Sequence, residues 1–340
     1  MKKAKKRAVP VGLIVLEIFL IAIFAFLSVW WFGKNYKDFY SVASKGAAIP
    51  GLDTKLSPQG LCVLPENDKG YTFAMSGYIS GEPSRVYLMN ENDIGKTGED
   101  TFVTFTDNGT AVKTHFGGVA CTENYLLVAS GKKIIRAALS DVYAAKNGGA
   151  VEIYDSFETG LSNAFCYVYG GELYAGEFYR PGNYETDTSH HIAVGGGMNH
   201  AFVYVFPIDE AAEGGVAQKT PTKVLSVCDQ VQGVVVTDDM ILLSTSYGLP
   251  DSKLRFCANP MKGEADSEVD LGGVKVPLYI LDADKKGTFT MPCMSEEMCL
   301  KDGKLYILFE SMSGKYRYFV RHRITNVLSV DLATLLKTYA

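Results

Sequence analysis

Several features that would point directly to a function are missing from this sequence of 340 residues. Outside the first ten residues there is no basic stripe, which argues against a nucleic-acid partner. The five histidines show no nucleophile–base spacing typical of a hydrolase motif. The seven cysteines are odd in number and follow no framework spacing, which argues against a disulfide-stapled fold. No small-x-small cleavage site lies at the usual distance after the N-terminal apolar run, so we do not expect a cleaved signal peptide.

The N-terminus differs sharply from the rest of the chain. Its first ten residues carry five Lys or Arg and no acid, and Val11–Phe32 is a run of 22 residues with one charge, Glu17. As a helix this run spans the ~30 Å hydrocarbon core of a bilayer. It ends in Trp30-Trp31-Phe32, aromatic residues that favour the headgroup layer. We therefore expect a cytoplasmic basic tail at 1–10 and an uncleaved signal-anchor helix at 11–33, with the remaining chain extracytoplasmic.

The remaining body is acidic. The whole chain has a formal net charge of −5, and leaving out the five N-terminal positive charges and Glu17 gives about −9. An acidic body argues against binding nucleic acid or anionic lipid through charge. The expected membrane contact is therefore the apolar helix.

A five-residue pattern recurs five times in the body, and a second apolar run follows each copy. Aligned on their third position, successive copies start 58, 46, 69 and 64 residues apart. A strand pair that recurs at such a period predicts a radial array of small antiparallel sheets, a β-propeller. The copies are Pro58–Cys62, Phe116–Ala120, Ser162–Cys166, Val231–Val235 and Ser295–Cys299.

This pattern predicts an all-β domain at 57–340 with five blades, or six if the stretch 247–276 holds a degenerate blade. We expect Val151–Phe157 as the fourth strand of blade two, and Leu278–Leu281 with Thr288–Met291 as the last two strands of blade four. The fifth blade lacks a fourth strand at the C-terminus. Part of the linker at 34–56 should supply it and close the ring, because closure removes exposed sheet edges.

Three cysteines occupy one register of the repeat. Cys62, Cys166 and Cys299 stand where the other copies have Ala or Val, which is how small buried apolar residues behave. We expect structural thiols there. The pairs Cys293/Cys299 and Cys228/Cys257 remain open.

In such an array the starts of the first strands, the ends of the second strands and the loops that follow them share one face. Those loops are very unequal: Tyr179–Asn199, Tyr247–Lys275 and Met312–Thr325 are long. Long loops on a regular scaffold are where binding usually occurs. We expect a pocket over blades three to five.

The predicted ligand-binding residues are polar or aromatic side chains at these positions. The adjacent histidines of the blade-three loop could bind a metal or transfer protons, but solvated or hydrogen-bonded loop histidines are more common. In blade five, Arg317 could pair with Glu310 or hold an anionic ligand. The set is Gln59, Asn163, Glu177, Arg180, Tyr184, His190, His191, Gln232, Tyr247, Glu296, Glu310 and Arg317.

Over about residues 57–335 the organisation resembles the senescence-marker/gluconolactonase-like and streptogramin-lyase-like propellers, with Pro58-Gln59-Gly60-Leu61 at the start of an inner strand. It also resembles membrane-anchored Gram-positive bacterial propellers that share the Gln-Gly start and a segment like Phe309-Glu310-Ser311. The first resemblance implies a divalent cation held by residues such as Asn163 and Glu296. Gln59 and Gln232 are amides where acids would hold such an ion more strongly.

The sequence favours a membrane-anchored binding module that presents a face to a cell-wall sugar or an envelope protein. We expect no catalytic residue and no resident cofactor. The alternatives are a metal-dependent hydrolase or lyase of the lactonase-like propeller type, and a scaffold subunit of an envelope complex in which Glu17 pairs with another membrane helix.

Overall fold

The computed structural model describes residues 10–33, 35–94 and 100–339. The chain divides into two compact units, Met1–Asp38 and Phe39–Ala340. Helix α1, Val11–Gly33, covers the predicted anchor segment. Among the described side chains, which leave out those of residues 26 and 28–33, no helix is long and apolar enough to cross a membrane. The predicted Trp30-Trp31-Phe32 belt falls on side chains outside the description, as does the basic tail at 1–9.

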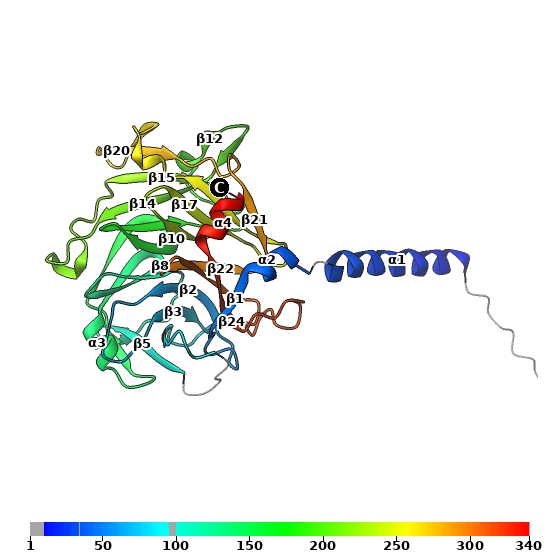
Figure 1. Cartoon of the computed structure of the whole chain (residues 1–340), viewed down its shortest axis with the longest axis horizontal. Coiled ribbons are helices and arrows are strands. Elements are labelled where there is room, and N and C mark those ends of the chain that lie inside the picture. The colour runs from blue at the N-terminus through cyan, green and yellow to red at the C-terminus, as the bar shows by residue number, and fades with distance from the viewer. Residues whose placement is uncertain (1–9, 34, 95–99, 340) are drawn as a thin grey trace, which may run out of the picture. The chain divides into compact units, whose positions relative to one another are not determined.

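Three sets of four antiparallel strands lie in different sheets of the second unit (Figure 1), and the first set belongs to a six-stranded sheet that also includes β6 (Thr110–Ala111) and β9 (Ala150–Glu152). Within each set most neighbours follow one another in sequence, but β21 pairs with β18 and β1 pairs with β24. The first is β2 (Ser57–Val63), β3 (Phe73–Tyr78), β4 (Arg85–Met89) and β5 (Thr101–Asp107). The second is β16 (Val231–Val236), β17 (Met240–Thr245), β18 (Ser252–Ala258) and β21 (Thr288–Met291). The third is β22 (Ser295–Lys301), β23 (Lys304–Phe309), β24 (Asn326–Asp331) and β1 (Ala43–Ala48).

A longer sheet runs in the order β19-β20-β15-β14-β11-β10-β8-β7. Its strands β8 and β10 are long because each changes partner midway at a glycine with positive φ, Gly131 (58°) or Gly160 (90°). The sheet therefore contains a three-stranded antiparallel part, β7-β8-β10, and a four-stranded one, β10-β11-β14-β15, which share β10. Its strands are β7 (Val119–Cys121), β8 (Tyr125–Ala138), β10 (Asp155–Tyr169), β11 (Glu172–Glu177), β14 (Ala201–Pro207), β15 (Lys223–Val227), β19 (Ser267–Asp270) and β20 (Lys275–Ile280).

The rest of the secondary structure consists of short strands and helices. Helix α3, Leu139–Ala144, follows β8, and its N-cap residue, Ala138, provides no side-chain cap. The short strands are β6 (Thr110–Ala111), β9 (Ala150–Glu152), β12 (Ile192–Val194) and β13 (Gly197–Asn199). The helical elements are α2 (Lys37–Val42), α3 (Leu139–Ala144), α4 (Leu332–Tyr339), η1 (Thr188–His190), η2 (Glu213–Gly215) and η3 (Pro260–Lys262).

The core lies between neighbouring sheets. β17 is buried on both faces over its whole length, whereas β5 alternates between buried and partly exposed residues. Side chains from β2–β4, such as Leu61 and Phe73, pack with Tyr306 and Val327 of β23 and β24. A sheet covered on both faces needs a continuous apolar run, which explains the uninterrupted Met240–Leu243 segment.

The glycines of the repeat are required by close backbone approach. The innermost strands β2, β7, β10, β16 and β22 contact one another in sequence order, and β22 also contacts β2. A Cβ on Gly118 would lie 2.4 Å from the backbone nitrogen of Cys166, and one on Gly233 would lie 2.6 Å from Cα of Glu297. Only glycine fits where these strands meet.

The predicted pairing of the two chain ends is confirmed. β1 pairs antiparallel with β24, with Ala43 opposite Val330 and Lys45 opposite Leu328. In Figure 1 the blue β1 lies beside β24. This strand covers an edge that β24 would otherwise expose.

Two strand predictions and one loop prediction were wrong. Leu278–Leu281 does not complete the unit of β16 and β17, because β20 pairs parallel with β15 in another sheet. β18 takes that place, so the loop predicted at Tyr247–Lys275 is in fact mostly structured. The segment Val151–Phe157 is divided: β9 pairs parallel with β5, and the start of β10 pairs with β8.

Candidate binding pocket

A pocket of about 580 Å³ lies where the inner strands begin. Gln59, Ala164, Gln232 and Glu296 line it, one from each of the strands β2, β10, β16 and β22. In all four strands the pairing register shifts at this position, which is a β-bulge. A bulge leaves a residue unpaired and re-aims its side chain. The recurring bulge therefore turns these residues toward a common space.

Aromatic residues form one side of the pocket. Phe178 follows β11, Tyr184 lies in the next loop and Tyr247 follows β17. The ring centroids are 5.3 Å apart for Phe178–Tyr184, 6.1 Å for Phe178–Tyr247 and 6.4 Å for Tyr184–Tyr247. The guanidinium carbon of Arg180 lies 3.9 Å from the Tyr247 ring centroid. This cation–π contact holds the Tyr247 ring at the rim.

Two carboxyl groups meet in the pocket lining. Glu296 is 2% exposed, and it is hydrogen-bonded to Glu310 at the end of β23. Burial, followed by the charge of Glu310, raises the pKa of Glu296 well above its usual range. Burial raises the pKa of Glu310 to about 7, although the positive charge of Lys315 opposes the rise. Two carboxyls in hydrogen-bond contact are better accommodated with one proton between them than with two negative charges.

Glu310 also contacts an amide of another strand. Nε2 of Gln59 donates to Oε2 of Glu310 at 3.3 Å and to the carbonyl oxygen of Pro58 at 2.8 Å. This contact joins β2 to the end of β23, two strands that are about 250 residues apart in the sequence.

Glu297 is a key buried residue that sequence reasoning did not single out. Its carboxylate accepts hydrogen bonds from the backbone N–H groups of Leu61 (2.8 Å), Val119 (2.8 Å) and Cys166 (3.0 Å). Burial raises its pKa, and the three N–H donors oppose that rise. The side chain thus joins β2, β7 and β10 to β22. The sequence did offer one sign of its importance. Ser295–Cys299 is the only one of the five copies of the repeat that contains acidic residues, and Glu297 stands beside Glu296 in it.

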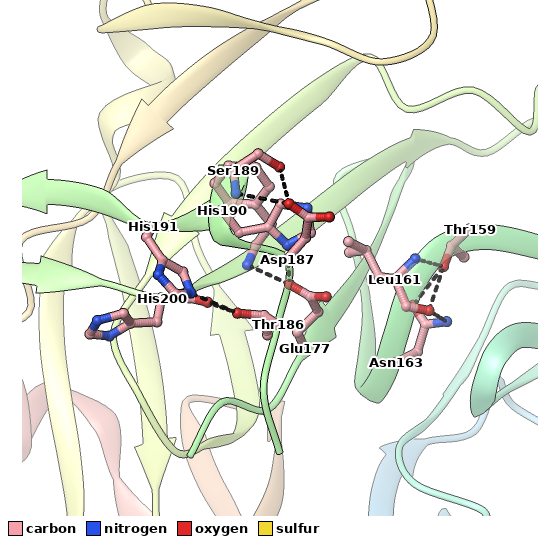
Figure 2. A network of polar contacts seen from close by, with 11 residues as sticks. Thr159, Leu161, Asn163, Glu177, Thr186, Asp187, Ser189, His190, His191 and His200 are labelled. Atoms are coloured by element: carbon pink, nitrogen blue, oxygen red, sulfur yellow. Dashed lines mark hydrogen bonds and ion pairs between the residues drawn. The ribbon is translucent and has the colours of Figure 1, made fainter. Parts of the chain in front are cut away.

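The predicted blade-three residues divide between the pocket and a polar network behind it (Figure 2). Glu177 is buried and accepts from Nδ1 of His190 at 2.8 Å and from the Phe202 N–H at 3.1 Å. His190 also stacks on Phe202, with ring centroids 4.3 Å apart. These contacts hold the loop against the sheet, and neither Glu177 nor His190 is among the pocket-lining residues.

The neighbouring histidines have other partners. The ring of His191 lies 4.7 Å from that of His200, and Nδ1 of His200 is 2.7 Å from Oδ1 of Asp229. Thr186, drawn beside them in Figure 2, donates to the carbonyl oxygen of His200. Thr186 also lines the pocket, so this hydrogen bond connects the backbone of His200 to the pocket wall.

Asn163 forms hydrogen bonds within its own strand, β10, and with the neighbouring strand β8. Its Nδ2 donates to the carbonyl oxygen of Gly131 at 2.9 Å, and its Oδ1 accepts from Thr159 at 3.0 Å. It is buried and it lines the pocket.

Arg317 does not pair with Glu310. Its guanidinium donates to the backbone carbonyl oxygens of Leu52 (2.8 Å) and Thr54 (2.7 Å). Both bonds come from Nη2, and they connect the loop that carries Lys315 and Tyr316 to the segment before β2.

The structure thus brings together seven of the twelve predicted residues and adds others. The lining includes Gln59, Asn163, Tyr184, Gln232, Tyr247, Glu296 and Glu310, but not Glu177, Arg180, His190, His191 or Arg317. The additional lining side chains are Tyr78, His115, Ser162, Ala164, Phe178, Asn183, Glu185, Thr186, Ser246, Lys315 and Tyr316. The sequence analysis selected residues at the ends of the second strands, such as Glu310. Tyr78 and Phe178 also stand at such ends, so a wider selection there would have included them.

The cysteines form no disulfide among the described residues. All seven cysteines are free thiols, and Cys62, Cys166 and Cys299 are buried as predicted. Neither open pair is formed as a disulfide. Within residues 10–33, 35–94 and 100–339, no group of three or more His, Cys, Asp or Glu is placed to hold a metal ion.

No family model and no curated protein matches this sequence. Solved structures with distant similarity include glutaminyl cyclase from Myxococcus xanthus, with a TM-score of 0.40 and 8% identity over 79% of this chain and 91% of that chain. A Thermus thermophilus protein named as a putative oxidoreductase (glucose dehydrogenase) has a TM-score of 0.39 and 12% identity, over 85% of this chain and 99% of that chain. Both have propeller-like folds. Similarity at this level says nothing about activity.

Proposed function

We propose that the body is a five-bladed β-propeller that binds a small hydroxylated ligand, such as a cell-wall sugar, at the mouth of its channel. The blade count is supported by the five inner strands, whose contacts run from β2 through β7, β10 and β16 to β22 and back to β2. In this assignment β10 serves two blades and β1 completes the fifth. A closed ring explains why β1 and β24, from opposite ends of the chain, form one sheet.

The observation that carries the binding proposal is the composition of the 580 Å³ pocket. Amide groups of Gln59 and Gln232 can both donate and accept hydrogen bonds, which suits hydroxyl groups. The rings of Phe178, Tyr184 and Tyr247 offer apolar surface on the same pocket. A pocket that combines aromatic rings with convergent polar groups is typical of a small-molecule site.

We further propose that the chain is held in the cell membrane by residues 11–33, with the propeller on the extracytoplasmic side. The support is the 22-residue run with one charge, preceded by five basic residues. Basic residues mark the cytoplasmic end of a membrane helix. Apolar side chains along α1 are exposed, for example Val11 at 75% and Phe24 at 74%, and exposed apolar surface of this extent calls for a covering partner.

Calorimetric titration of the full chain in detergent with glucose and with N-acetylglucosamine tests the binding proposal. We expect saturable heat with at least one of these sugars, and a loss of about tenfold or more in affinity for Tyr247→Ala, because a ring contact is worth about 1.4 kcal/mol or more. Tyr318→Ala is the matched control, since Tyr318 is 78% exposed and lies outside the pocket. Equal affinity for the two variants would contradict the proposal.

The second candidate is the metal-dependent hydrolase or lyase, which the Glu296–Glu310 pair favours because paired carboxyls can transfer protons. It predicts that Ca²⁺ or Mn²⁺ raises the Tm of the full chain and that Glu296→Gln abolishes this shift. No Tm change with either ion would count against it. The scaffold alternative has less support, since the exposed aromatic pair Tyr318 and Phe319 is small for an assembly surface.

A further inference from the structure

We infer that the ligand of this pocket carries a protonated amine, and that Glu296 and Glu310 bind that amine. The ligand class is then a hydroxylated primary amine of the amino-sugar type rather than a neutral sugar. This inference rests on the proposed binding pocket and adds a chemical requirement to it.

The first support is the charge around the pocket. Three carboxyl groups line it, those of Glu185, Glu296 and Glu310, against one Lys side chain, Lys315. The Lys315 ammonium lies 4.7 Å from the centroid of the Tyr316 ring, so this cation already has an aromatic partner. A pocket with more acids than bases attracts and holds cationic groups.

The second support is the chemistry of the carboxyl pair. Between them the two carboxyls offer four oxygen atoms and share a proton, while Gln59 supplies a single donor at 3.3 Å. An ammonium group has three N–H donors and no acceptor, which matches a surplus of acceptors. When the ammonium binds, the shared proton leaves to solvent and the ligand keeps its own charge. Binding therefore releases a proton.

The third support is the difference between the two sides of the pocket, one aromatic and the other carrying the carboxyl pair. The Arg180 guanidinium stacks on Tyr247 at the aromatic side, 3.9 Å from the ring centroid, and the carboxyl pair stands at the inner strands. A ligand with an amine at one end is oriented by this arrangement, with the amine toward Glu296 and Glu310. Its ring then lies toward Phe178, Tyr184 and Tyr247, which offer apolar surface.

The test compares glucosamine with glucose, which differ by an ammonium in place of a hydroxyl at one carbon. Titration calorimetry on the full chain in detergent at pH 7 should give an affinity for glucosamine about tenfold or more above that for glucose. Repeating it in two buffers of different ionisation enthalpy should show proton release on glucosamine binding only.

The pH dependence has a definite sign. The pKa of Glu310 is raised to about 7, so lowering the pH protonates the carboxyl pair and the ammonium must then displace a proton. Between pH 7 and pH 5 the glucosamine affinity should fall by up to about tenfold per pH unit. The glucose affinity should change less over the same range.

The variant Glu310→Gln should lower the glucosamine-to-glucose affinity ratio to about one, whereas Glu264→Gln, which changes an exposed carboxyl outside the pocket, should keep the wild-type ratio. Equal wild-type affinities without proton release would overturn this inference and leave the proposed sugar site standing. Failure of both probes and of N-acetylglucosamine to bind would overturn the proposed site itself. The proton-release measurement uses the wild-type chain, so it decides the matter even if a variant does not fold.

Discussion

Glu297 shows how one side chain can connect several sheets. It is 1% exposed, and its two carboxylate oxygens accept three backbone N–H groups from β2, β7 and β10. Gly60 and Gly118 directly precede two of these N–H groups, and a Cβ at either glycine would clash with the neighbouring inner strand. The carboxylate supplies acceptors where the inner strands are too close for side chains from their own residues.

Replacement of Glu297 by Ala should destabilise the fold by roughly 3–5 kcal/mol, because three buried N–H groups lose their acceptor. Urea unfolding of the full chain in detergent, followed by tyrosine fluorescence or circular dichroism, measures this free energy. Glu264→Ala, at an exposed position, should change it by no more than about 0.5 kcal/mol. Equal unfolding midpoints for the two variants would show that Glu297 does not hold the sheets together.

At the scale of the element, the β-bulges of the inner strands decide where the polar residues point. Gln59, Gln232 and Glu296 occupy the same position in their copies of the repeat, and the pairing register shifts at each of them. In a regular strand, side chains alternate strictly between the two faces. The bulge breaks that alternation and turns each residue toward the pocket. β1 is the second important element, because it completes a sheet whose other strands come from the opposite end of the chain.

Replacing Ala43–Ala48 with alternating Gly and Ser should expose the edge of β24. We expect faster amide hydrogen exchange in Asn326–Asp331 and a lower Tm, since β1 buries Ala47 against the core. The same replacement in β19, Ser267–Asp270, is the control, because that edge strand is mostly exposed. If exchange in β24 stays unchanged after loss of β1, the pairing does not contribute to closing the sheet.

At the scale of the whole molecule, the chain consists of two compact units, and the larger one begins at Phe39. The smaller unit contains the apolar helix α1, and the larger contains every strand. The proposed pocket lies entirely within the larger unit. Localisation and ligand binding should therefore be separable functions of one chain.

Full-length protein should remain in the membrane pellet after alkaline carbonate extraction if residues 11–33 span the bilayer as we propose. A variant that lacks residues 1–33 should move to the soluble fraction, and protease added outside protoplasts should digest the body of the full-length chain. Changing the five N-terminal basic residues to Gln is the control for orientation. Release of the full-length chain by carbonate would contradict the anchor.

Much of the fold followed from local patterns, and the exceptions share a cause. The strand Thr288–Met291 was predicted with its observed bounds, because alternation or apolar runs between turns mark strands directly. The placement of β20 was wrong, since its parallel pairing with β15 joins segments about fifty residues apart. Of the site, the polar positions at strand starts were predictable, whereas the Arg317 contacts with Leu52 and Thr54 were not.

The sequence alone determined the repeat, the approximate strand positions, the apolar N-terminal run and the polar residues at the starts of the inner strands. These depend on periodicity and composition, which are local properties. The tertiary structure decided that Glu296 meets Glu310, that Glu297 accepts from three strands and that Glu177 faces His190. Those contacts depend on bulges and on the packing of distant strands, and neither leaves a pattern in neighbouring residues.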